Sequence, residues 1–311
     1  MSALIEDVTA RKIINSQYGL SLAYFIARTM PNWLGHRIAI WAADFISSRS
    51  DWKMVRAARC NQWVARGEQL GGSLLNQAVK ENFRSIADSI FDLYHNMDNP
   101  SAFLGLIEPH PTAIQLVQRP EFSERGFVLA GIHLSNFDMV FQMGGLAGMQ
   151  ALALTMPELS AGYQKQLEMR VKKGMHLIQA SVGNLKRAID HLKSGGVVMT
   201  GIDRPDESYI YRPKFFGHPA AVPIHHIFLA LKARVPILVG ATIKETDGKY
   251  HFLFSEPIEM QPHPDRQTEI LLNAERVLHV AENFIKTDPR QWSMTFPVWP
   301  EMVEQVNQYP P

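Results

Sequence analysis

The sequence predicts an α/β protein with a mostly parallel central sheet flanked by helices, and with an N-terminal helical region. Near residue 121 the pattern changes to short apolar runs that alternate with amphipathic segments, which is typical of βα units in a parallel sheet. Before that point the apolar residues recur at helical spacing. With 311 residues, 46% of them hydrophobic, the chain can bury a large core. We therefore expect a helical region over residues 1–120 and an α/β core over residues 121–311.

Individual elements follow from the same periodicities. Helices are expected in the first region over residues 34–47, 53–59 and 76–94. Strands are expected in the core near residues 126–133, 151–155, 175–179, 197–202 and 236–243. The turn signal Asp247-Gly248 predicts a hairpin from the last of these into a strand at 250–254. The intervening helices are expected at 160–173, 184–193, 224–233 and 266–285.

The turn after the first core strand, His133-Leu134-Ser135-Asn136-Phe137-Asp138, is the most informative part of the chain. Ser135 or Asn136 is suited to cap the helix that follows. A His at the carboxyl end of a strand and an Asp in the next helical turn can form a pair in which the carboxylate fixes the ring tautomer. The other ring nitrogen is then left to take a proton. We expect His133 to be a general base that activates a substrate hydroxyl, with Asp138 as its orienting partner.

A second His-x4-acid match occurs at His251 and Glu256, whereas about one such match is expected by chance in a chain of this composition. His251 lies in an alternating stretch, residues 250–254, that predicts a continuous strand. Residues five apart on an extended strand point to opposite faces. We therefore assign no catalytic role to His251.

Composition excludes several functional classes. The formal net charge is +1 and no basic tract occurs, so nothing indicates nucleic-acid binding. The single Cys60 excludes an internal disulfide and is compatible with a reducing compartment. His218, His225 and His226 have no Cys or carboxylate at ligand spacing, so no metal site is expected. The chain also lacks the nucleophile elbow and the glycine-rich phosphate loops of other enzyme classes.

One early segment has a composition compatible with membrane contact. No secretory signal is apparent, and the uncharged stretch 13–27 is shorter than the roughly 20 residues that span a bilayer. It is rich in Ile, Leu, Tyr and Phe, and Trp33 follows it. Two interpretations remain open: a helix lying at a membrane interface, and an amphipathic helix packed on the domain. The basic face of residues 53–59 likewise fits anionic lipid or solvent.

Three further segments are candidates for substrate binding. Asp203-Arg204 follows a predicted strand, and Arg204 is suited to a phosphate or an oxyanion, the alternative being a local ion pair. Phe215-Phe216-Gly217 is expected either to wall a tunnel for an acyl chain or to pack in the core. The segment 289–300, dense in aromatics and prolines, is expected to meet a membrane interface, to close such a tunnel, or simply to pack over the sheet.

Taken in order, these features resemble a known family. They are the strand ending in His133-x4-Asp138, the helix ending in Leu192-Lys193-Ser194-Gly195-Gly196, Asp203-Arg204, Phe215-Phe216-Gly217 with Pro219-Ala220, and Val235-Pro236-Ile237. They are similar to the lysophospholipid acyltransferase superfamily, above all to its branch of bacterial lipid A biosynthesis (lauroyl/myristoyl) acyltransferases and phosphatidylinositol mannoside acyltransferases. The resemblance covers roughly residues 15–300. Many lipid A enzymes of this branch carry Glu at the position of Asp138. The Glu-Gly-Thr-Arg block of the glycerolipid branch is missing, which leaves the acceptor open.

The resemblance implies a peripheral membrane O-acyltransferase at the cytoplasmic face of the cell membrane. It would move a fatty acyl group from acyl-CoA or acyl carrier protein to a hydroxyl of a membrane lipid or glycolipid, with His133 as base and Asp138 as its partner. Because the thioester donor is already activated, neither a metal nor a bound cofactor is expected. Two alternatives stay open: a non-catalytic lipid-binding relative of the same fold, and a thioester or lipid hydrolase that passes the acyl group to water.

Overall fold

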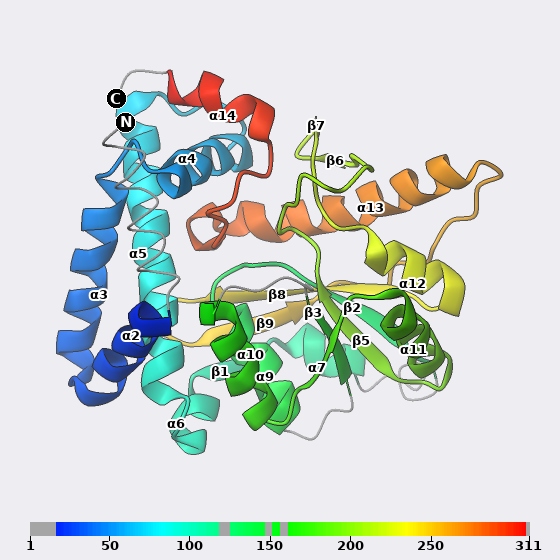
Figure 1. Cartoon of the computed structure of the whole chain (residues 1–311), viewed down its shortest axis with the longest axis horizontal. Helices are drawn as coiled ribbons and strands as arrows, with labels where there is room; N and C mark the ends of the chain where they lie inside the picture. The colour runs from blue at the N-terminus through cyan, green and yellow to red at the C-terminus, as the bar shows by residue number, and fades with distance from the viewer. Residues whose placement is uncertain (1–16, 118–124, 147–150, 156–160, 309–311) are drawn as a thin grey trace.

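The computed structural model describes residues 17–117, 125–146, 151–155 and 161–308. A seven-stranded sheet in the order β1-β9-β8-β2-β5-β3-β4 runs through the middle of the molecule (Figure 1). Its neighbours pair in parallel, except for the antiparallel pair β8 and β9. The strands are β1 (Ile107–Pro109), β2 (Phe127–Gly131), β3 (Ala151–Thr155), β4 (His176–Gln179), β5 (Val197–Gly201), β8 (Ile237–Lys244) and β9 (Tyr250–Phe254). The expected fold class is confirmed.

Successive residues of the central strands enter different hydrophobic clusters, as strand geometry requires. Val128 and Ala130 of β2 pack in the main core, to which α11 (Val182–Lys193), α12 (His225–Ala233) and α13 (Arg266–Thr287) contribute buried side chains. Leu129, between them, packs in a second cluster with residues of α7 (Pro111–Val117) and α9 (Phe137–Leu146). Helices therefore cover both faces of the sheet, which explains why its central strands β2, β5 and β3 are almost entirely apolar.

The hairpin between β8 and β9 forms at the expected turn. Ile243 pairs with His251 and Lys244 with Tyr250, and the chain reverses at Gly248, whose φ of 80° is in the left-handed region that glycine favours. His251 therefore lies on a strand, as expected, and its ring bonds Asp247 at 3.0 Å.

The N-terminal region is a helical layer beside one end of the sheet (Figure 1). Its helices are α2 (Gln17–Thr29), α3 (Asn32–Ser47), α4 (Lys53–Ala65), α5 (Gly72–Asn96) and α6 (Pro100–Gly105). The expectation of helices alone up to residue 120 is wrong at β1, which pairs with β9 at the sheet edge. Three residues are too few to show a periodicity, so the strand left no signal in the sequence.

Residues from α4 and from the C-terminal segment complete the core. Cys60, Trp63 and Val64 of α4 belong to the main cluster, as do Trp292 and Trp299. The remaining short elements are the hairpin β6 (Lys214–Phe215) and β7 (His218–Pro219), α10 (Ala161–Lys172), the 3-10 turn η1 (Pro289–Gln291) and α14 (Pro300–Asn307). Among the described residues no helix combines the length and the apolar character needed to cross a membrane.

Candidate active site

His133 lies just beyond the carboxyl end of β2, in the turn that leads into α9. The turn is fixed by Ser135, whose backbone is left-handed (φ 50°) and whose N–H donates to the Gln291 carbonyl at 2.7 Å. The carbonyl of His133 itself accepts from the Ser293 N–H at 2.7 Å. A backbone held on both sides in this way places the imidazole in one position, with 22% of its side chain exposed.

The carboxylate that holds the His133 ring belongs to Asp203, not to Asp138. Asp203 follows β5, the neighbour of β2, and its Oδ1 accepts from His133 Nδ1 at 2.6 Å. Its Oδ2 accepts from the His133 backbone N–H at 2.8 Å and from the Trp292 indole N–H at 2.9 Å. With a proton on Nδ1, the neutral ring carries its lone pair on Nε2, which has no hydrogen-bond partner among the described residues.

The electrostatics of Asp203 favour the ionised form. The side chain is fully buried, which opposes ionisation, but the charge of His133 and the hydrogen bonds from His133 and Trp292 outweigh that cost. The pKa of Asp203 is therefore lowered below its ordinary value. A carboxylate bonded to Nδ1 fixes the ring tautomer that leaves the lone pair on Nε2, which is the arrangement that a general base requires.

Asp138 has a different partner from the one expected. It lies in the first turn of α9, and its Oδ1 accepts from Arg170 Nε of α10 at 2.8 Å. Both side chains are 14% exposed, and although burial opposes the charge of Arg170, Asp138 raises the pKa of that guanidinium. The expected contact between His133 and Asp138 does not form. Asp203 occupies the Nδ1 side of His133, and the acid of the motif bonds Arg170 instead.

His133 opens into a cavity of about 400 Å³. Apolar side chains from the sheet and from α9 form much of its wall: Phe137, Phe141, Leu154, Met175, Leu177 and Met199. The ring of Phe137 meets that of His133 edge-on at 4.5 Å between centroids. Polar groups gather on the remaining wall, among them Tyr163, Arg170, Thr200, Arg204 and His225. An apolar cavity with one base and a few polar groups is the usual form of a small-molecule site.

Arg204 also lines this cavity. Its guanidinium lies over the ring of Phe296 at 4.5 Å and over that of Tyr163 at 5.8 Å from the centroids. Asp203 bonds His133 and Trp292 and forms no ion pair with Arg204, and no other carboxylate of the described residues lies within ion-pair distance of the guanidinium. Asp206 senses this charge: hydrogen bonds from Ser208 lower its pKa, and the charge of Arg204 adds to that effect. A stacked guanidinium with open N–H groups is suited to a phosphate or carboxylate ligand.

The aromatic segment Phe215-Phe216-Gly217 does not line this cavity, and of its two expected roles, tunnel wall and core packing, Phe215 takes the second. Phe215 is fully buried and packs against Trp292 and Trp299, with ring centroids 5.9 and 5.8 Å away. Gly217 borders a separate shallow groove along α13. Trp292 and Trp299 are themselves buried, so the C-terminal segment packs over the sheet as the simplest expectation had it, and these indoles are not at an interface.

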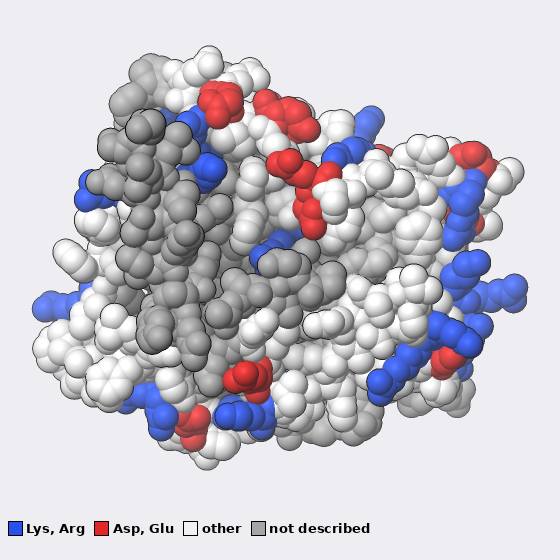
Figure 2. Space-filling view, viewed as in Figure 1, with Lys and Arg blue, Asp and Glu red and all other residues white. Residues whose placement is uncertain are grey.

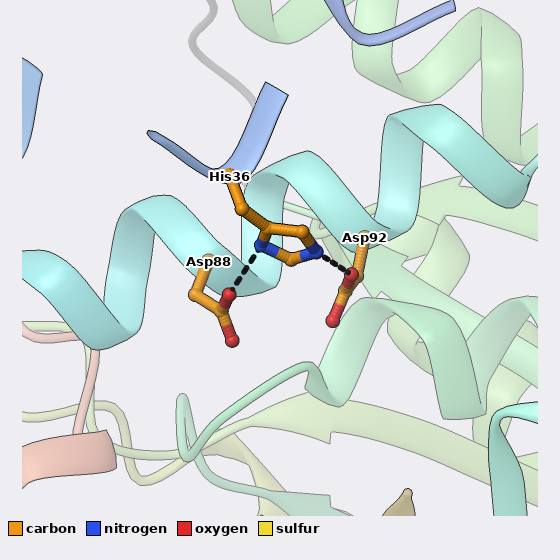
Figure 3. Close-up of side chains that lie close together, drawn as sticks. All are labelled: His36, Asp88 and Asp92. Atoms are coloured by element: carbon orange, nitrogen blue, oxygen red, sulfur yellow. Dashed lines mark ion pairs between the residues drawn. The ribbon is translucent and has the colours of Figure 1, made fainter. Parts of the chain in front are cut away.

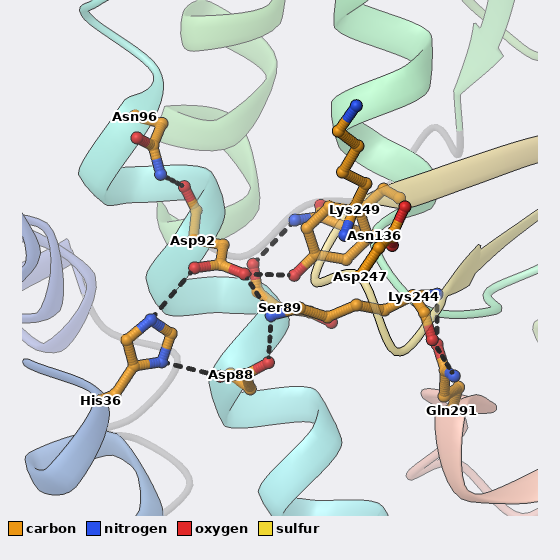
Figure 4. A network of polar contacts seen from close by, with 11 residues as sticks. His36, Asp88, Ser89, Asp92, Asn96, Asn136, Lys244, Asp247, Lys249 and Gln291 are labelled. Carbon is orange, nitrogen blue, oxygen red and sulfur yellow. Dashed lines mark hydrogen bonds and ion pairs between the residues drawn. The ribbon is translucent and has the colours of Figure 1, made fainter. Parts of the chain in front are cut away.

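A second polar cluster lies between the helical layer and the sheet. His36 of α3 contacts Asp88 at 2.7 Å and Asp92 at 3.3 Å, an arrangement with the spacing of a metal site (Figure 3). The Lys244 ammonium, however, lies 2.6 Å from each of these carboxylates (Figure 4). The Tyr250 hydroxyl also donates to Asp92. Because a protein cation already fills the position between the two acids, we interpret the cluster as an ion-pair network.

Comparison with known proteins decides the family. The sequence profile of the family described as bacterial lipid A biosynthesis acyltransferase matches residues 114–300, more than half of the chain. The chain belongs to this family. The match spans β2, the His133 turn, β5 and Trp292, so every residue of the site lies within it. A search of curated proteins found no match. Membership supports an acyltransferase that acts on lipids, in agreement with the resemblance seen in the sequence.

Proposed function

We propose that this lipid A acyltransferase family member is a peripheral membrane O-acyltransferase with His133 as its general base. One observation carries the proposal: a His133–Asp203 pair, oriented for proton transfer at Nε2, faces an apolar cavity in a chain of this family. Within the part of the chain that the structure describes, no Ser, Thr or Cys side chain is bonded to Nε2 of His133. The pair is therefore suited to direct transfer, in which the acceptor hydroxyl itself attacks the thioester.

The reaction then needs one base and one stabiliser of negative charge. Nε2 of His133 takes the proton of the acceptor hydroxyl while its oxygen attacks the thioester carbonyl. Asp203 stabilises the imidazolium, and Arg204 or backbone N–H groups stabilise the oxyanion. As the tetrahedral intermediate collapses, the C–S bond breaks and the imidazolium proton goes to the sulfur. An ester and a free thiol are formed, and the base is regenerated.

The cavity and the surface near it match the two substrates. The apolar wall around Phe137 and Phe141 is suited to the acyl chain, and Arg204 to a phosphate of the donor or of the acceptor. Lys and Arg gather over the end of the molecule formed by α11 and α12 (Figure 2), and α12 begins at the cavity with His225. A basic surface there fits an anionic donor, either the phosphates of CoA or an acidic carrier protein.

Membrane association is supported by the outer face of α3. Four exposed residues follow one another along α3 at intervals of four, so that successive members are neighbours on the helix surface: Trp33, Arg37, Trp41 and Phe45. Arg49 follows two residues after the end of α3. Trp33 is 64% and Trp41 70% exposed, and Arg37 and Arg49 lie over Trp33 and Phe45. Aromatics interleaved with arginines are typical of a helix in the interface of an anionic bilayer. We call these five residues the α3 stripe and propose that it meets the cytoplasmic leaflet.

The proposal is tested by incubating the full chain with labelled acyl-CoA or acyl carrier protein and a bacterial lipid extract, followed by mass spectrometry of the lipids. We expect a new acylated lipid, and a fall in its rate of at least ~10²-fold for His133→Ala, the usual scale for a general base. His251→Ala is the matched control, because that ring lies on β9 outside the cavity, and it should keep most of the activity. An active His133→Ala chain would overturn the mechanism, and free fatty acid as the sole product would show a hydrolase instead.

A further inference from the structure

The carboxylate that orients His133 is itself oriented by a residue far away in the sequence. Asp203 is fully buried, and three N–H groups surround its two oxygens. Two of these come from His133, and the third is the indole N–H of Trp292, at 2.9 Å from Oδ2. A buried carboxylate depends strongly on each such donor, since water cannot replace a lost hydrogen bond there.

We infer that Trp292 is a positioning residue for the proposed acyl transfer, acting through Asp203 on the proton affinity and orientation of His133. The inference rests on the proposed function. The donated hydrogen bond draws negative charge on Asp203 toward the indole and away from the imidazole. It also stops the carboxylate from turning about its Cβ–Cγ bond, which would release Nδ1.

The fold holds this indole as firmly as it holds the histidine. Leu134 and Trp292 form an antiparallel bridge, so the backbones of the two segments lie side by side. The Trp292 carbonyl accepts from the buried amide of Asn82 on α5 at 2.8 Å, and the Gln291 amide is bonded to the backbone of Lys244 on both sides (Figure 4). Asn136 of the His133 turn donates to the Ser89 carbonyl, also on α5. α5 of the helical layer therefore supports both the segment that carries Trp292 and the turn that carries His133.

A matched control is available in the same aromatic cluster. Trp299 is 1% exposed, its ring centroid lies 6.2 Å from that of Trp292, and its indole N–H has no hydrogen-bond partner among the described residues. Replacing either indole by phenyl removes the same atoms from the same core. Only the change at position 292 removes a donor from Asp203.

The test compares Trp292→Phe with Trp299→Phe in the full chain, using the pH profile of kcat/KM for transfer from acyl-CoA. Without the indole donor, Asp203 attracts the imidazolium more strongly, so we expect the acid limb of Trp292→Phe to move to higher pH by roughly half a unit. We also expect kcat to fall roughly tenfold, the scale of one weakened hydrogen bond to a charged group. Trp299→Phe should leave the acid limb unmoved. The midpoint of the His133 ring titration, followed by NMR without substrate, should shift in the same direction.

Other ionisable groups are common to both variants and leave the comparison intact. Those that line the cavity with His133 come from α10, from the loop after β5 and from α12, and they are Tyr163, Arg170, Arg204, Asp206, Tyr209 and His225. If Trp292→Phe fails to fold, benzothienylalanine at position 292 keeps the bicyclic shape without the N–H and carries the same expectation. Identical acid limbs and ring titrations for the two variants, in a chain that transfers acyl groups, would overturn the inference alone. No transfer by the unchanged chain would overturn the proposed function beneath it.

Discussion

Two acids near His133 have different partners and therefore different roles. Asp203, which follows the neighbouring strand β5, holds His133, whereas Asp138, five residues after His133 in the first turn of α9, holds Arg170 in the cavity wall. Both acids lie within a few residues of strand ends, but only one touches the base. They should therefore respond differently to the same substitution.

Asp203→Asn is expected to lower kcat at least ~10²-fold, because it removes the charge that stabilises the imidazolium. The amide NH₂ would also face an N–H donor, from His133 or Trp292, so we expect the variant to be less stable by about 1–3 kcal/mol. Steady-state kinetics and urea unfolding measure the two effects. Activity close to that of the unchanged chain would show that the Asp203 carboxylate takes no part in catalysis.

Asp138→Asn is expected to act through Arg170 instead. Removing one partner of a mostly buried ion pair leaves an uncompensated charge, which typically costs 3–5 kcal/mol of folding free energy, to an order of magnitude. Asp138→Asn and Arg170→Gln should therefore be non-additive in a double-mutant cycle of kcat/KM, whereas Asp138→Asn and Asp203→Asn should be closer to additive. Asp138→Glu keeps the charge, and we expect it to be partly tolerated. Additive effects for Asp138 and Arg170 would contradict this pairing.

How far the sequence predicts these residues can be argued from the register of β2 and β5. His133 was found because a histidine directly after an apolar run is conspicuous, and Asp203 was recognised as the end of a second strand. Gly131 pairs with Gly201, and His133 and Asp203 each follow two residues later. The matching positions of His133 and Asp203 after these paired glycines identify them as partners, but only once β2 and β5 are known to be neighbours. Strand adjacency depends on long-range packing, which local periodicity does not encode. The aromatic density of residues 289–300 singles out the segment that contains Trp292, about ninety residues after Asp203, but nothing in the sequence indicates that its indole bonds Asp203.

At the scale of elements, α12 begins with two histidines that are held neutral. Burial lowers the pKa of His225 to about 4, and burial together with the adjacent His225 lowers the pKa of His226 well below its ordinary value. Neither ring nitrogen of His226 has a hydrogen-bond partner among the described residues. In the unfolded chain both rings take up a proton near pH 6.5. The unfolded state therefore binds more protons between about pH 6.5 and pH 4, and folding stability must fall as the pH falls through that window.

We expect His226→Leu to flatten this dependence. The variant should be more stable than the unchanged chain by about 1 kcal/mol at pH 7, because an unpaired polar group leaves the core, and by more than that at pH 5. Urea midpoints at both pH values measure the difference. His176→Leu is the control, because that ring is exposed on β4 and should change the slope little. A difference that shrinks on acidification would have the wrong sign.

Element boundaries show which local signals were sufficient. β3 and β9 have the predicted bounds, and α13 begins at the predicted Arg266, where Asp265 caps it through the N–H of Thr268. In each of these segments the apolar residues recur at regular spacing, and at least one end is marked by a turn or capping residue. β1 and the β6–β7 hairpin were not predicted, because strands of two or three residues are defined only by their partners.

For the whole molecule, the helical layer and the α/β core share one interior. α4 contributes to the main hydrophobic cluster, and the buried amides of Asn61 and Asn82 bond backbone carbonyls of the segment 290–296. α2 is tied to the turn after α5 by Tyr24 and Arg28, which both contact Asp98, two residues beyond the end of that helix. Deleting the first two helices would therefore remove packing as well as any lipid contact. Substitution of exposed residues separates these two roles.

The expected membrane contact is residues 13–33, of which 13–16 lie outside the described residues. The α3 stripe extends this proposed contact along α3 and to Arg49 just beyond it. We expect Trp41→Ser to weaken binding to vesicles of anionic phospholipid roughly tenfold, since an exposed indole that enters the interface gives up a large apolar surface. Arg37→Glu should weaken binding mainly at low salt, because about 1 kcal/mol per arginine comes from the surface charge. Both positions are exposed, so unfolding midpoints should stay close to that of the unchanged chain.

Val182→Ser and Ile210→Ser provide the control for this last prediction. These side chains are 89% and 87% exposed, more than any of the three aromatic side chains of the stripe, yet they lie on α11 and in the loop after β5. If exposure alone drove binding, they would matter most. If the stripe is the lipid contact, they should leave vesicle sedimentation unchanged while Trp41→Ser reduces it. Equal binding by Trp41→Ser and the unchanged chain would contradict the assignment of the lipid contact to the α3 stripe. The C-terminal indoles of Trp292 and Trp299 would not replace it, because both are buried.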